Sequence, residues 1–269
     1  MSILKSKAQI IATIGPSCSA VPVLSEMISH QMDVGRLNLS WGGFDEHTRY
    51  IEAIREAGKI AGRKILILLD LPGPRIQTGG IHTYDKEATS VLTDEDKKCI
   101  QFAVDQKVDY IALSFVGDEK DVLECRDVIK KCGGRQPVVS KIERKKALQN
   151  LDSIVSISDA LMVARGDLGG EIPLEQIPFA QAEIIQKAKT AGKPSITATQ
   201  MLISMMDKVT PTRADVTDVA NAILQGSDAV MLSEETAVGK FPIEVITMME
   251  KIVVEAEKHM KGILHVNPL

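Results

Sequence analysis

The chain has 269 residues, of which 44% are hydrophobic and 25% are charged, which is ordinary for a globular protein of one large or two small domains. A formal net charge of -4 and an aromatic content of 3% argue against nucleic-acid binding, because a basic surface and stacking side chains are both scarce. No apolar window has the length of a signal peptide or a membrane span. The sequence therefore predicts a cytoplasmic protein with small-molecule partners, no nucleic acid and no membrane.

Short apolar runs, each followed by a longer stretch of helical period, recur eight times along the chain. Most runs are continuous rather than alternating, as in parallel strands that are covered on both faces. This α/β pattern favours a single (β/α)8 TIM barrel over residues 1–269 rather than an open sheet, and no GxGxxG motif follows the first run. The expected strands cover residues 9–14, 33–39, 65–70, 108–115, 137–142, 160–165, 194–200 and 228–233.

Two segments between the expected strands carry further predictions. One is a helix that starts near PTRAD at 211–215, because apolar residues after it recur at the spacing of one helix face. The other is residues 79–92, which lack periodicity and precede a helix that begins near TDED at 93–96. A loop of this length in a compact domain is either functional or marks a missing element. The expected helix face comprises Val216, Val219, Ala220, Ile223 and Leu224.

Polar side chains follow six expected strands at their C-terminal ends, where a barrel of this class carries its catalytic groups. Glu143 and Asp167 come from neighbouring strands, and carboxylates are suitable ligands for Mg²⁺. Arg36 and Lys141 would face one anion, as phosphoryl transfer requires when the protein neutralises charge in the transition state. The strand-end set comprises Arg36, Asn38 and Ser40, which share one strand face, and Asp70, Lys141, Glu143, Arg165, Asp167, Thr199, Gln200, Ser233 and Glu235.

Several of these residues also have a purely structural interpretation. An Asp after a strand is commonly a helix N-cap that accepts from free N–H groups, so Asp167 is open between a cap and a metal ligand. Glu143 and Lys141 could equally form an exposed ion pair of small energy. For Arg36 a functional role is favoured, because an unpaired charge inside an apolar strand is costly.

Eight short stretches stand at or near the expected strand ends: TIGPS (13–17), RLNLS (36–40), DLPGPRIQTG (70–79), SKIE (140–143), ARGDLG (164–169), ATQML (198–202), PTRAD (211–215) and MLSEETAVG (231–239). Together and in this order they resemble the catalytic barrel of the pyruvate kinase family, from residue 8 to residue 257. The resemblance implies a barrel of the phosphoenolpyruvate-binding type. It also implies phosphoenolpyruvate or pyruvate and ADP or ATP as substrates, with Mg²⁺, or Mn²⁺ in its place, as the metal.

The resemblance also assigns roles to individual residues. Lys141 matches the family's catalytic lysine, Thr199 matches the threonine implicated in protonating the enolate, and Arg36 matches the phosphate clamp. Glu143 and Asp167 match the divalent-metal ligands. The implied substrate-binding residues are Arg36, Ser114, Lys141, Ala164, Gly166, Asp167 and Thr199, and the implied nucleotide-binding residues are Thr13, Pro16 and Asn38.

Some positions depart from the family pattern. The family inserts a lid domain after the third strand, whereas here only residues 79–92 occupy that place, so the lid is expected to be absent, as is the family's C-terminal regulatory domain. Trp41 stands where the family has a nucleotide-contacting His, and Gln77 stands where it has an Arg. We therefore expect the enolpyruvate side of the site to be intact and the ADP side to be weakened.

A further departure concerns monovalent cations. Asn38, Ser40, Asp70 and Leu71 match the family's potassium site, yet residues 71–75 read LPGPR where potassium-dependent members have Thr-Lys-Gly-Pro-Glu. Members with Leu and a basic residue at the first and last of these positions tend not to need K⁺, since a fixed cation can replace a mobile one. We expect Arg75 to do so here, and K⁺ not to be required.

The leading prediction is a lidless pyruvate kinase that transfers a phosphoryl group from phosphoenolpyruvate to ADP with Mg²⁺, a glycolytic reaction. One alternative is Mg²⁺-dependent enolate chemistry on pyruvate or oxaloacetate, such as decarboxylation, without a nucleotide. A second alternative is a non-catalytic protein that binds phosphoenolpyruvate or regulates a relative. A homodimer is compatible with each, because the family's barrel-to-barrel contact does not need the other domains.

Overall fold

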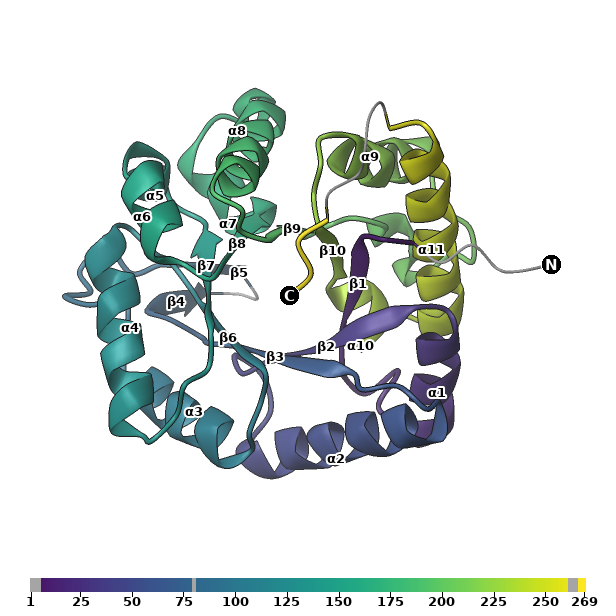
Figure 1. The fold of residues 1–269 in the computed structure, drawn as a ribbon, viewed down its shortest axis with the longest axis horizontal. Coiled ribbons are helices and arrows are strands. Elements are labelled where there is room, and N and C mark those ends of the chain that lie inside the picture. Colours follow the sequence, from purple (N-terminus) through teal and green to yellow (C-terminus); the bar gives the residue numbers. More distant parts are fainter. Residues whose placement is uncertain (1–5, 79–80, 261–265) are drawn as a thin grey trace. The chain divides into compact units, whose positions relative to one another are not determined.

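The computed structural model describes residues 6–78, 81–260 and 266–269. Eight parallel strands among these residues follow the order β1-β10-β9-β8-β7-β6-β3-β2 of a closed barrel (Figure 1), and the predicted (β/α)8 fold class is confirmed. They are β1 (Gln9–Thr13), β2 (Met32–Asn38), β3 (Leu66–Asp70), β6 (Tyr110–Leu113), β7 (Val138–Ile142), β8 (Ala160–Ala164), β9 (Ser195–Ala198) and β10 (Ala229–Leu232). Each lies within two residues of its predicted bounds.

Helices follow the strands in alternation, as the sequence pattern predicted. They are α1 (Val21–Ser29), α2 (Phe44–Ile60), α3 (Asp94–Asp105), α4 (Glu119–Lys131), α5 (Lys145–Gln149), α6 (Leu151–Ile157), α7 (Arg165–Glu171), α8 (Ile177–Thr190), α9 (Arg213–Leu224), α10 (Glu234–Ala237) and α11 (Pro242–Lys258), with short 3-10 turns η1 (Leu174–Gln176) and η2 (Ile203–Met206). Strands β7 and β8 are buried along their whole length, as expected for strands covered on both faces.

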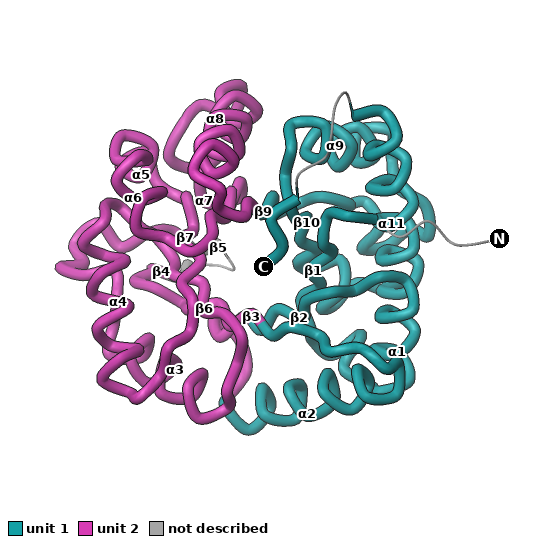
Figure 2. The backbone as a smooth tube through the Cα atoms, viewed as in Figure 1, with its two compact units in different colours: residues 1–37, 44–67, 196–269 teal, residues 38–43, 68–195 magenta. Residues whose placement is uncertain are grey.

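The chain forms two compact units (Figure 2). Unit 1 comprises residues 1–37, 44–67 and 196–269. Within it β1 pairs with β2 on one side and with β10 on the other, and β10 pairs with β9. The register sets Thr13 directly opposite Arg36, which brings a hydroxyl and a guanidinium together at the ends of two neighbouring strands.

Unit 2 comprises residues 38–43 and 68–195. Its parallel strands are joined in the order β3, β6, β7 and β8. Because parallel strands of one sheet end at the same edge, the residues that follow β3, β6, β7 and β8 are gathered there. Unit 2 also holds the antiparallel hairpin of β4 (Arg75–Thr78) and β5 (Ile81–Tyr84).

The hairpin corrects one expectation. Residues 79–92 were expected to be a loop without secondary structure, but β5 lies inside this range and pairs with β4, with Arg75 opposite Tyr84. A strand of four residues is too short to show a clear period in the sequence. Residues 79 and 80, at the start of the expected loop, lie outside the described part of the chain.

The predicted starts of α3 and α9 agree with the structure, whereas the predicted buried face of α9 agrees only in part. Thr93 and Thr212 are the N-caps of α3 and α9, and each forms a reciprocal capping box with the Asp three residues later. The expected face of α9 is partly wrong, because Val216 and Leu224 are 36% and 50% exposed. The helix packs against α11, which shifts its buried face by about one position. That face comprises Asp215, Val219, Ala222 and Ile223.

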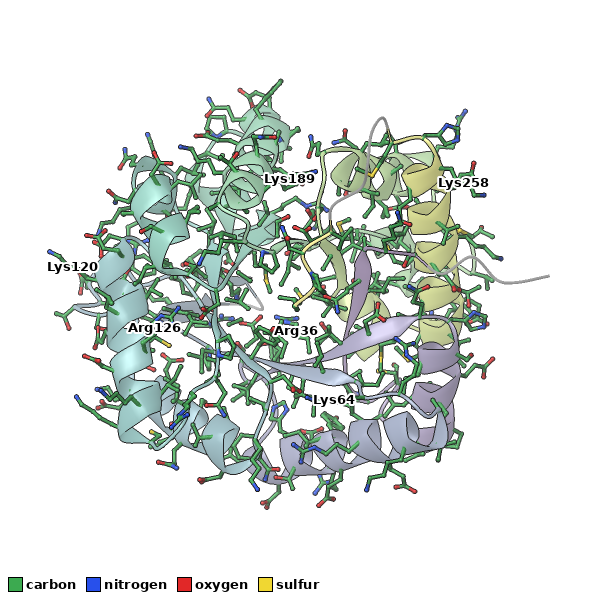
Figure 3. All side chains as sticks on the ribbon, in the orientation of Figure 1. Arg36, Lys64, Lys120, Arg126, Lys189 and Lys258 are labelled. Atoms are coloured by element: carbon green, nitrogen blue, oxygen red, sulfur yellow. The ribbon has the colours of Figure 1, made fainter. Side chains whose placement is uncertain are left out.

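Charged side chains divide between the helices and the strand ends. Of the basic residues labelled in Figure 3, Arg36 alone lies on a strand, and it is buried. The others lie on helices or on the loop after α2: Lys64, Lys120, Arg126, Lys189 and Lys258. None of the helices in the described ranges combines the length and apolar character that crossing a bilayer requires.

Candidate active site

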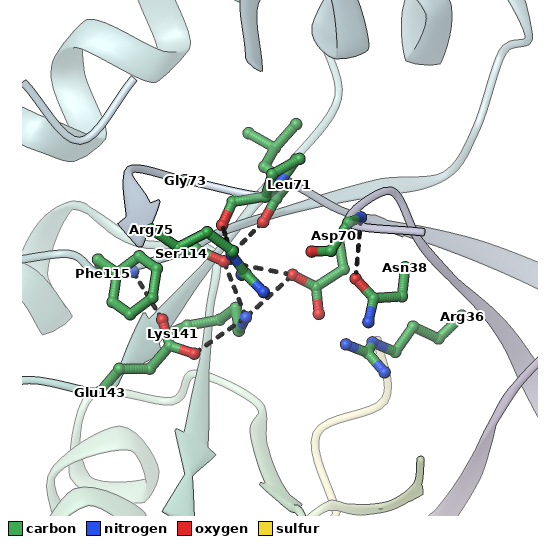
Figure 4. Close-up of polar contacts among 12 residues, drawn as sticks. Arg36, Asn38, Asp70, Leu71, Gly73, Arg75, Ser114, Phe115, Lys141 and Glu143 are labelled. Carbon is green, nitrogen blue, oxygen red and sulfur yellow. Dashed lines mark hydrogen bonds and ion pairs between the residues drawn. The ribbon is translucent and has the colours of Figure 1, made fainter. Parts of the chain in front are cut away.

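A buried lysine lies at the centre of the strand ends of unit 2 (Figure 4). Lys141 Nζ, at the end of β7, lies 3.0 Å from Asp70 Oδ1 and 3.0 Å from Glu143 Oε1, and it donates to Ser114 Oγ at 2.8 Å. Lys141 is only 5% exposed, and both carboxylates are 1% exposed. Because both residues are buried, the exposed ion pair that the sequence left open for Lys141 and Glu143 is excluded. A buried ammonium needs nearby carboxylates to remain charged.

Glu143 is held at both of its oxygen atoms. Oε2 accepts a hydrogen bond from the backbone N–H of Phe115 at 2.6 Å. Oε1 lies within ion-pair distance of Lys141 but has no partner in hydrogen-bond geometry. Phe115 has a φ of +57°, which is unfavourable for a residue with a side chain, so the N–H that binds Glu143 comes from strained backbone.

Asp167 lies in the first turn of α7, the short helix that follows β8. The N-cap of this helix is Ala164, which has no side-chain cap, and Asp167 is three residues further on. The alternative that Asp167 is an N-cap is therefore wrong. Gly166 and Asp167 both belong to the first turn, whose N–H groups have no partner within the helix. Ala164 is buried and Gly166 is exposed.

Burial raises the pKa of both carboxyl groups at this site. For Glu143 the positive charge of Lys141 lowers the pKa and the charge of Asp167 raises it further. For Asp167 burial is again the largest cause, and the charges of Lys141 and Arg75, together with a hydrogen bond to Glu143, lower the pKa. The net direction is upward for both groups, so the nearby lysine compensates their desolvation only in part.

These carboxyl groups fit a divalent cation. Glu143 Oε1, which is buried and paired with Lys141 only as an ion pair, lies in a pair of desolvated carboxylates with Asp167, and such oxygen atoms are ligands that Mg²⁺ or Mn²⁺ prefers. Among the described residues, no group of three or more His, Cys, Asp and Glu side chains could hold a metal. An ion held by the pair would need water or substrate oxygen atoms to complete its coordination, as the sequence predicted.

The residues of the expected monovalent-cation site lie in unit 2. Ser40 N donates to Asn38 Oδ1 at 3.2 Å, and Leu39 N donates to the backbone oxygen of Asp70 at 3.1 Å. The Ser114 hydroxyl donates to the backbone oxygen of Leu71 at 2.7 Å. These bonds tie the segment after β2 to the end of β3, and the hydroxyl oxygen of Ser40 is buried without a hydrogen-bond partner in the described residues.

Arg75 begins β4, close to the same strand ends. Its Nε donates to the Pro72 oxygen at 2.7 Å, and its guanidinium carbon lies 5.5 Å from the centroid of the Phe115 ring. Its charge also lowers the pKa of Asp167. Arg75 is thus a fixed cation on the side of the site where the sequence predicts one.

Other residues of the predicted site belong to unit 1. Arg36 Nη1 donates to Thr13 Oγ1 at 2.9 Å, and the Thr13 hydroxyl donates to the Leu232 oxygen at 2.8 Å. Both residues are buried, whereas Pro16 is exposed. Thr199 and Gln200, at the end of β9, have φ values of +73° and +55°. Two consecutive left-handed residues, one of them β-branched, are strained backbone of the kind found at functional sites.

Two site residues had no assigned role in the sequence analysis. Phe115 follows Ser114 directly after β6, but the sequence gives no sign of its left-handed backbone. Glu235 was noted at a strand end only. It is fully buried, and it accepts from the N–H groups of Ser233 at 2.7 Å and Leu202 at 3.2 Å. It therefore joins the segments that follow β9 and β10 in unit 1.

Comparison with known proteins supplies the family. A family model described as pyruvate kinase, barrel domain, matches residues 5–91 and 87–246. A protein named pyruvate kinase from Thermococcus litoralis is 35% identical over 343 aligned positions, which cover 98% of this chain and 72% of the relative. The pyruvate kinase of Thermotoga maritima is 34% identical, covering 94% and 72%, and that of Bacillus licheniformis is 36% identical, covering 94% and 57%.

The form of these matches is informative. The 343 aligned positions of the Thermococcus litoralis relative exceed the 269 residues of this chain by 74, so at least that many positions of the relative have no counterpart here. The two segments matched by the family model overlap at residues 87–91. The matches cover the residues around Lys141 and Asp167 as well as those around Arg36, and the chain belongs to the pyruvate kinase family, a family of phosphotransferases.

Proposed function

We propose that this chain catalyses Mg²⁺-dependent transfer of a phosphoryl group from phosphoenolpyruvate to ADP, which gives pyruvate and ATP in glycolysis. The observation that carries the proposal is the buried Lys141 Nζ, which lies 3.0 Å from carboxylate oxygen atoms of both Asp70 and Glu143. A desolvated ammonium is well suited to neutralise the phosphoryl group in transit and the enolate that forms. Lys141 would therefore act on the reacting atoms.

Glu143 and Asp167 would hold the divalent metal, Mg²⁺ or Mn²⁺. When bound, the metal would supply positive charge to the phosphoryl and enolate oxygen atoms. The N–H groups of Gly166 and Asp167, in the first turn of α7, would bind the substrate carboxylate, since helix N-termini favour anions. Ala164 and Ser114 would line the same substrate region.

Arg36 would clamp the transferring phosphate, and Thr199 would take part in protonating the enolate. The hydrogen bond from Arg36 to Thr13 supports this role, because it fixes the guanidinium before substrate binds. The left-handed backbone of Thr199 supports a functional role at that position. Thr13, Pro16 and Asn38 would contact the nucleotide.

Arg75 would take the role of a monovalent cation, so that activity does not depend on K⁺. Its charge already acts on Asp167, and a guanidinium cannot dissociate as an ion can. The displaced ion would otherwise use Asn38, Ser40, Asp70 and Leu71. A strong rise in activity on adding K⁺ would contradict this part of the proposal.

Residues 79–92 would stand in place of the family's lid domain, with the whole chain acting as one catalytic barrel in the cytoplasm, alone or as a homodimer. The division of the family match into two segments that overlap at residues 87–91 supports this, as do the 74 unmatched positions of the relative. A site without a lid exchanges water more freely, so we expect a slow enzyme.

A second candidate is enolate chemistry on pyruvate or oxaloacetate without a nucleotide. It is favoured by one observation, namely that Lys141, Asp70, Glu143 and Asp167 all lie in unit 2. Such chemistry would use this cluster and the metal but would not need the nucleotide contacts of unit 1.

The deciding experiment incubates the purified chain with Mg²⁺ and phosphoenolpyruvate, with and without ADP, and follows pyruvate and ATP. ADP-dependent formation of both supports the kinase, whereas turnover of oxaloacetate without a nucleotide supports the second candidate. Thermal stabilisation by phosphoenolpyruvate without any turnover would indicate a binding protein. Lys141→Met should lower the kinase rate about 100–1000-fold, while Lys145→Met, a matched change at an exposed lysine of α5, should not.

A further inference from the structure

Four side chains from three segments of unit 2 form a continuous stack beside Glu143. The Tyr84 ring of β5 lies 5.4 Å from the Phe115 ring, measured between centroids. The guanidinium carbon of Arg144 lies 3.7 Å from the centroid of Tyr84, and that of Arg75 lies 5.5 Å from the centroid of Phe115. Contacts of this kind are favourable because a cation is attracted to an aromatic face. The stack joins the β4–β5 hairpin to the loop after β6 and to the end of β7.

Phe115 is the member of the stack that touches the site. Its backbone N–H donates to Glu143 Oε2 at 2.6 Å, and its backbone oxygen accepts from Arg144 Nη1 at 3.2 Å. This backbone is left-handed, with a φ of +57°, a conformation that a residue with a side chain keeps only when its surroundings enforce it. The stack supplies such surroundings.

The packing below the Phe115 ring is equally close. A Cβ atom added to Gly73 would lie 2.8 Å from Phe115 Cδ2, so the ring sits directly against the backbone of Gly73. Gly73 is itself held by a hydrogen bond from its N–H to Asp96 Oδ1 at 2.9 Å. The ring is thus confined by Gly73, Arg75 and Tyr84, and a shift of the hairpin would allow the backbone of Phe115 to relax.

We propose that Tyr84 is a positioning residue. It holds Phe115 in its left-handed conformation and so keeps the Phe115 N–H on Glu143, which fixes the carboxylate that pairs with Lys141. Strand β5 also contacts α7, the helix that carries Asp167, so one hairpin supports both carboxylates. The contacts do not depend on the reaction, and only the catalytic consequence rests on the proposed function.

The first test measures the backbone of Phe115 without any ligand. Hydrogen–deuterium exchange of residues 112–117 is compared between the parent chain and Tyr84→Ala. We expect exchange on the order of tenfold faster in the variant, since loss of one aromatic contact raises the equilibrium constant for local opening by about that factor. Tyr84→Phe, which keeps the ring, should match the parent chain. Ile76→Ala should also match it, because Ile76 lies on β4 of the same hairpin but is 52% exposed.

Tyr84→Leu makes the same comparison with the apolar volume retained, in case Tyr84→Ala does not fold. Unchanged exchange of residues 112–117 in the variant that folds would overturn the proposal. Equal acceleration in Ile76→Ala would also overturn it, because the effect would then belong to the hairpin in general.

The second test measures the affinity of the two carboxylates, Glu143 and Asp167, for a metal ion. Binding of Mn²⁺ alone is followed by electron paramagnetic resonance. The affinity should be about tenfold lower in Tyr84→Leu than in the parent chain, which is the size of effect expected when a group that orients a metal ligand is lost. It should be unchanged in Tyr84→Phe. Equal affinity in all three proteins would overturn the catalytic consequence. If the parent chain showed no kinase activity, the proposed function would fail, whereas the exchange experiment would still decide whether Tyr84 positions Phe115.

Discussion

The strand ends of the two units hold their functional side chains by different means. In unit 2, Lys141 is surrounded by carboxylates, and opposite charges hold one another in a buried cluster. In unit 1, Arg36 donates to the hydroxyl of Thr13, and the backbone of Thr199 is left-handed, which sets the direction of its side chain. The first arrangement depends on balanced charge, and the second depends on a hydrogen bond from Arg36 to a neutral partner and on φ angles.

This difference predicts what each unit tolerates. Removing one charge from unit 2 leaves the remaining buried charges uncompensated, which is costly for both stability and catalysis. Removing one hydroxyl or relieving one strained residue in unit 1 alters position without removing a charge. Substitutions in unit 2 should therefore have the larger effects.

Asp167→Asn should have the largest effect. The change removes one charge of the proposed metal site and keeps the size of the side chain, so Mg²⁺-dependent kinase activity should fall at least ~100-fold. Initial rates measured over a range of Mg²⁺ concentrations would show this. Glu171→Gln changes the other carboxyl of the same helix and should leave the rate unchanged. Equal rates for Asp167→Asn and the parent chain would remove Asp167 from the metal site.

Thr13→Val should have a smaller effect, because it removes a neutral partner of Arg36. A hydrogen bond to a charged group contributes about 1.5–3 kcal/mol, so the KM for phosphoenolpyruvate should rise about tenfold or more with kcat less affected. Thr247→Val serves as the control, since that hydroxyl bonds only to the Ile243 oxygen within α11. A fall in kcat without any change in KM would show that Thr13 does not position the phosphate clamp.

Gln200→Gly should stabilise the protein slightly. Gln200 has a φ of +55°, and glycine adopts this conformation without the cost that other residues incur. Relief of the left-handed conformation gains about 1–2 kcal/mol, and the greater freedom of glycine in the unfolded chain offsets about 0.4–1 kcal/mol of it. Urea unfolding should therefore show a rise in the free energy of unfolding of up to about 1 kcal/mol. Gln225→Gly, at the C-cap of α9 with a φ of -71°, has no such strain to relieve and should not stabilise. A loss of stability in both variants would contradict the strain argument.

Glu235→Gln should change how stability depends on pH. Burial raises the pKa of Glu235 above its ordinary value of 4.5, so the folded state holds the proton to higher pH than the unfolded state does. The stability of the parent chain therefore falls as pH rises from 4.5 through the raised folded-state pKa. Glutamine cannot ionise, and the stability of the variant relative to the parent should rise over that window.

Urea unfolding between about pH 4 and about pH 8 covers the range over which a carboxyl with a raised pKa titrates. The relevant quantity is the difference in unfolding free energy between Glu235→Gln and the parent chain at each pH. A difference that stays constant with pH would show that Glu235 has the same pKa in the folded and unfolded states.

The sequence predicted the strands well because parallel strands covered on both faces are continuous apolar runs. The grouping of residues at their ends, such as Lys141 and Asp70, could be predicted from strand position alone, since parallel strands end at one edge. The starts of α3 and α9 were also predicted, near residues 93–96 and 211–215, because a helix start depends on a few neighbouring residues, here capping boxes that join positions three apart.

Other features depend on tertiary packing and could not be read from the sequence. The left-handed backbone of Phe115 and Thr199 is imposed by their surroundings, since neither residue type favours it. The hairpin partner of Arg75 is Tyr84, but its strands are too short to show a period. Val216 was assigned to the buried face of α9 because a pattern alone does not show where the neighbouring helix α11 packs.

The ion pair between Asp70 and Lys141 also bears on the order in which the protein folds. The two residues are 71 positions apart in the chain, and β6 lies between β3 and β7 in the sheet. Contacts so far apart in the chain carry a large loop-closure cost, and we expect this pair to form after the folding transition state. Substitutions at Asp70 or Lys141 should accordingly change the rate of unfolding much more than the rate of folding, so that the buried ionic cluster would slow the unfolding of unit 2.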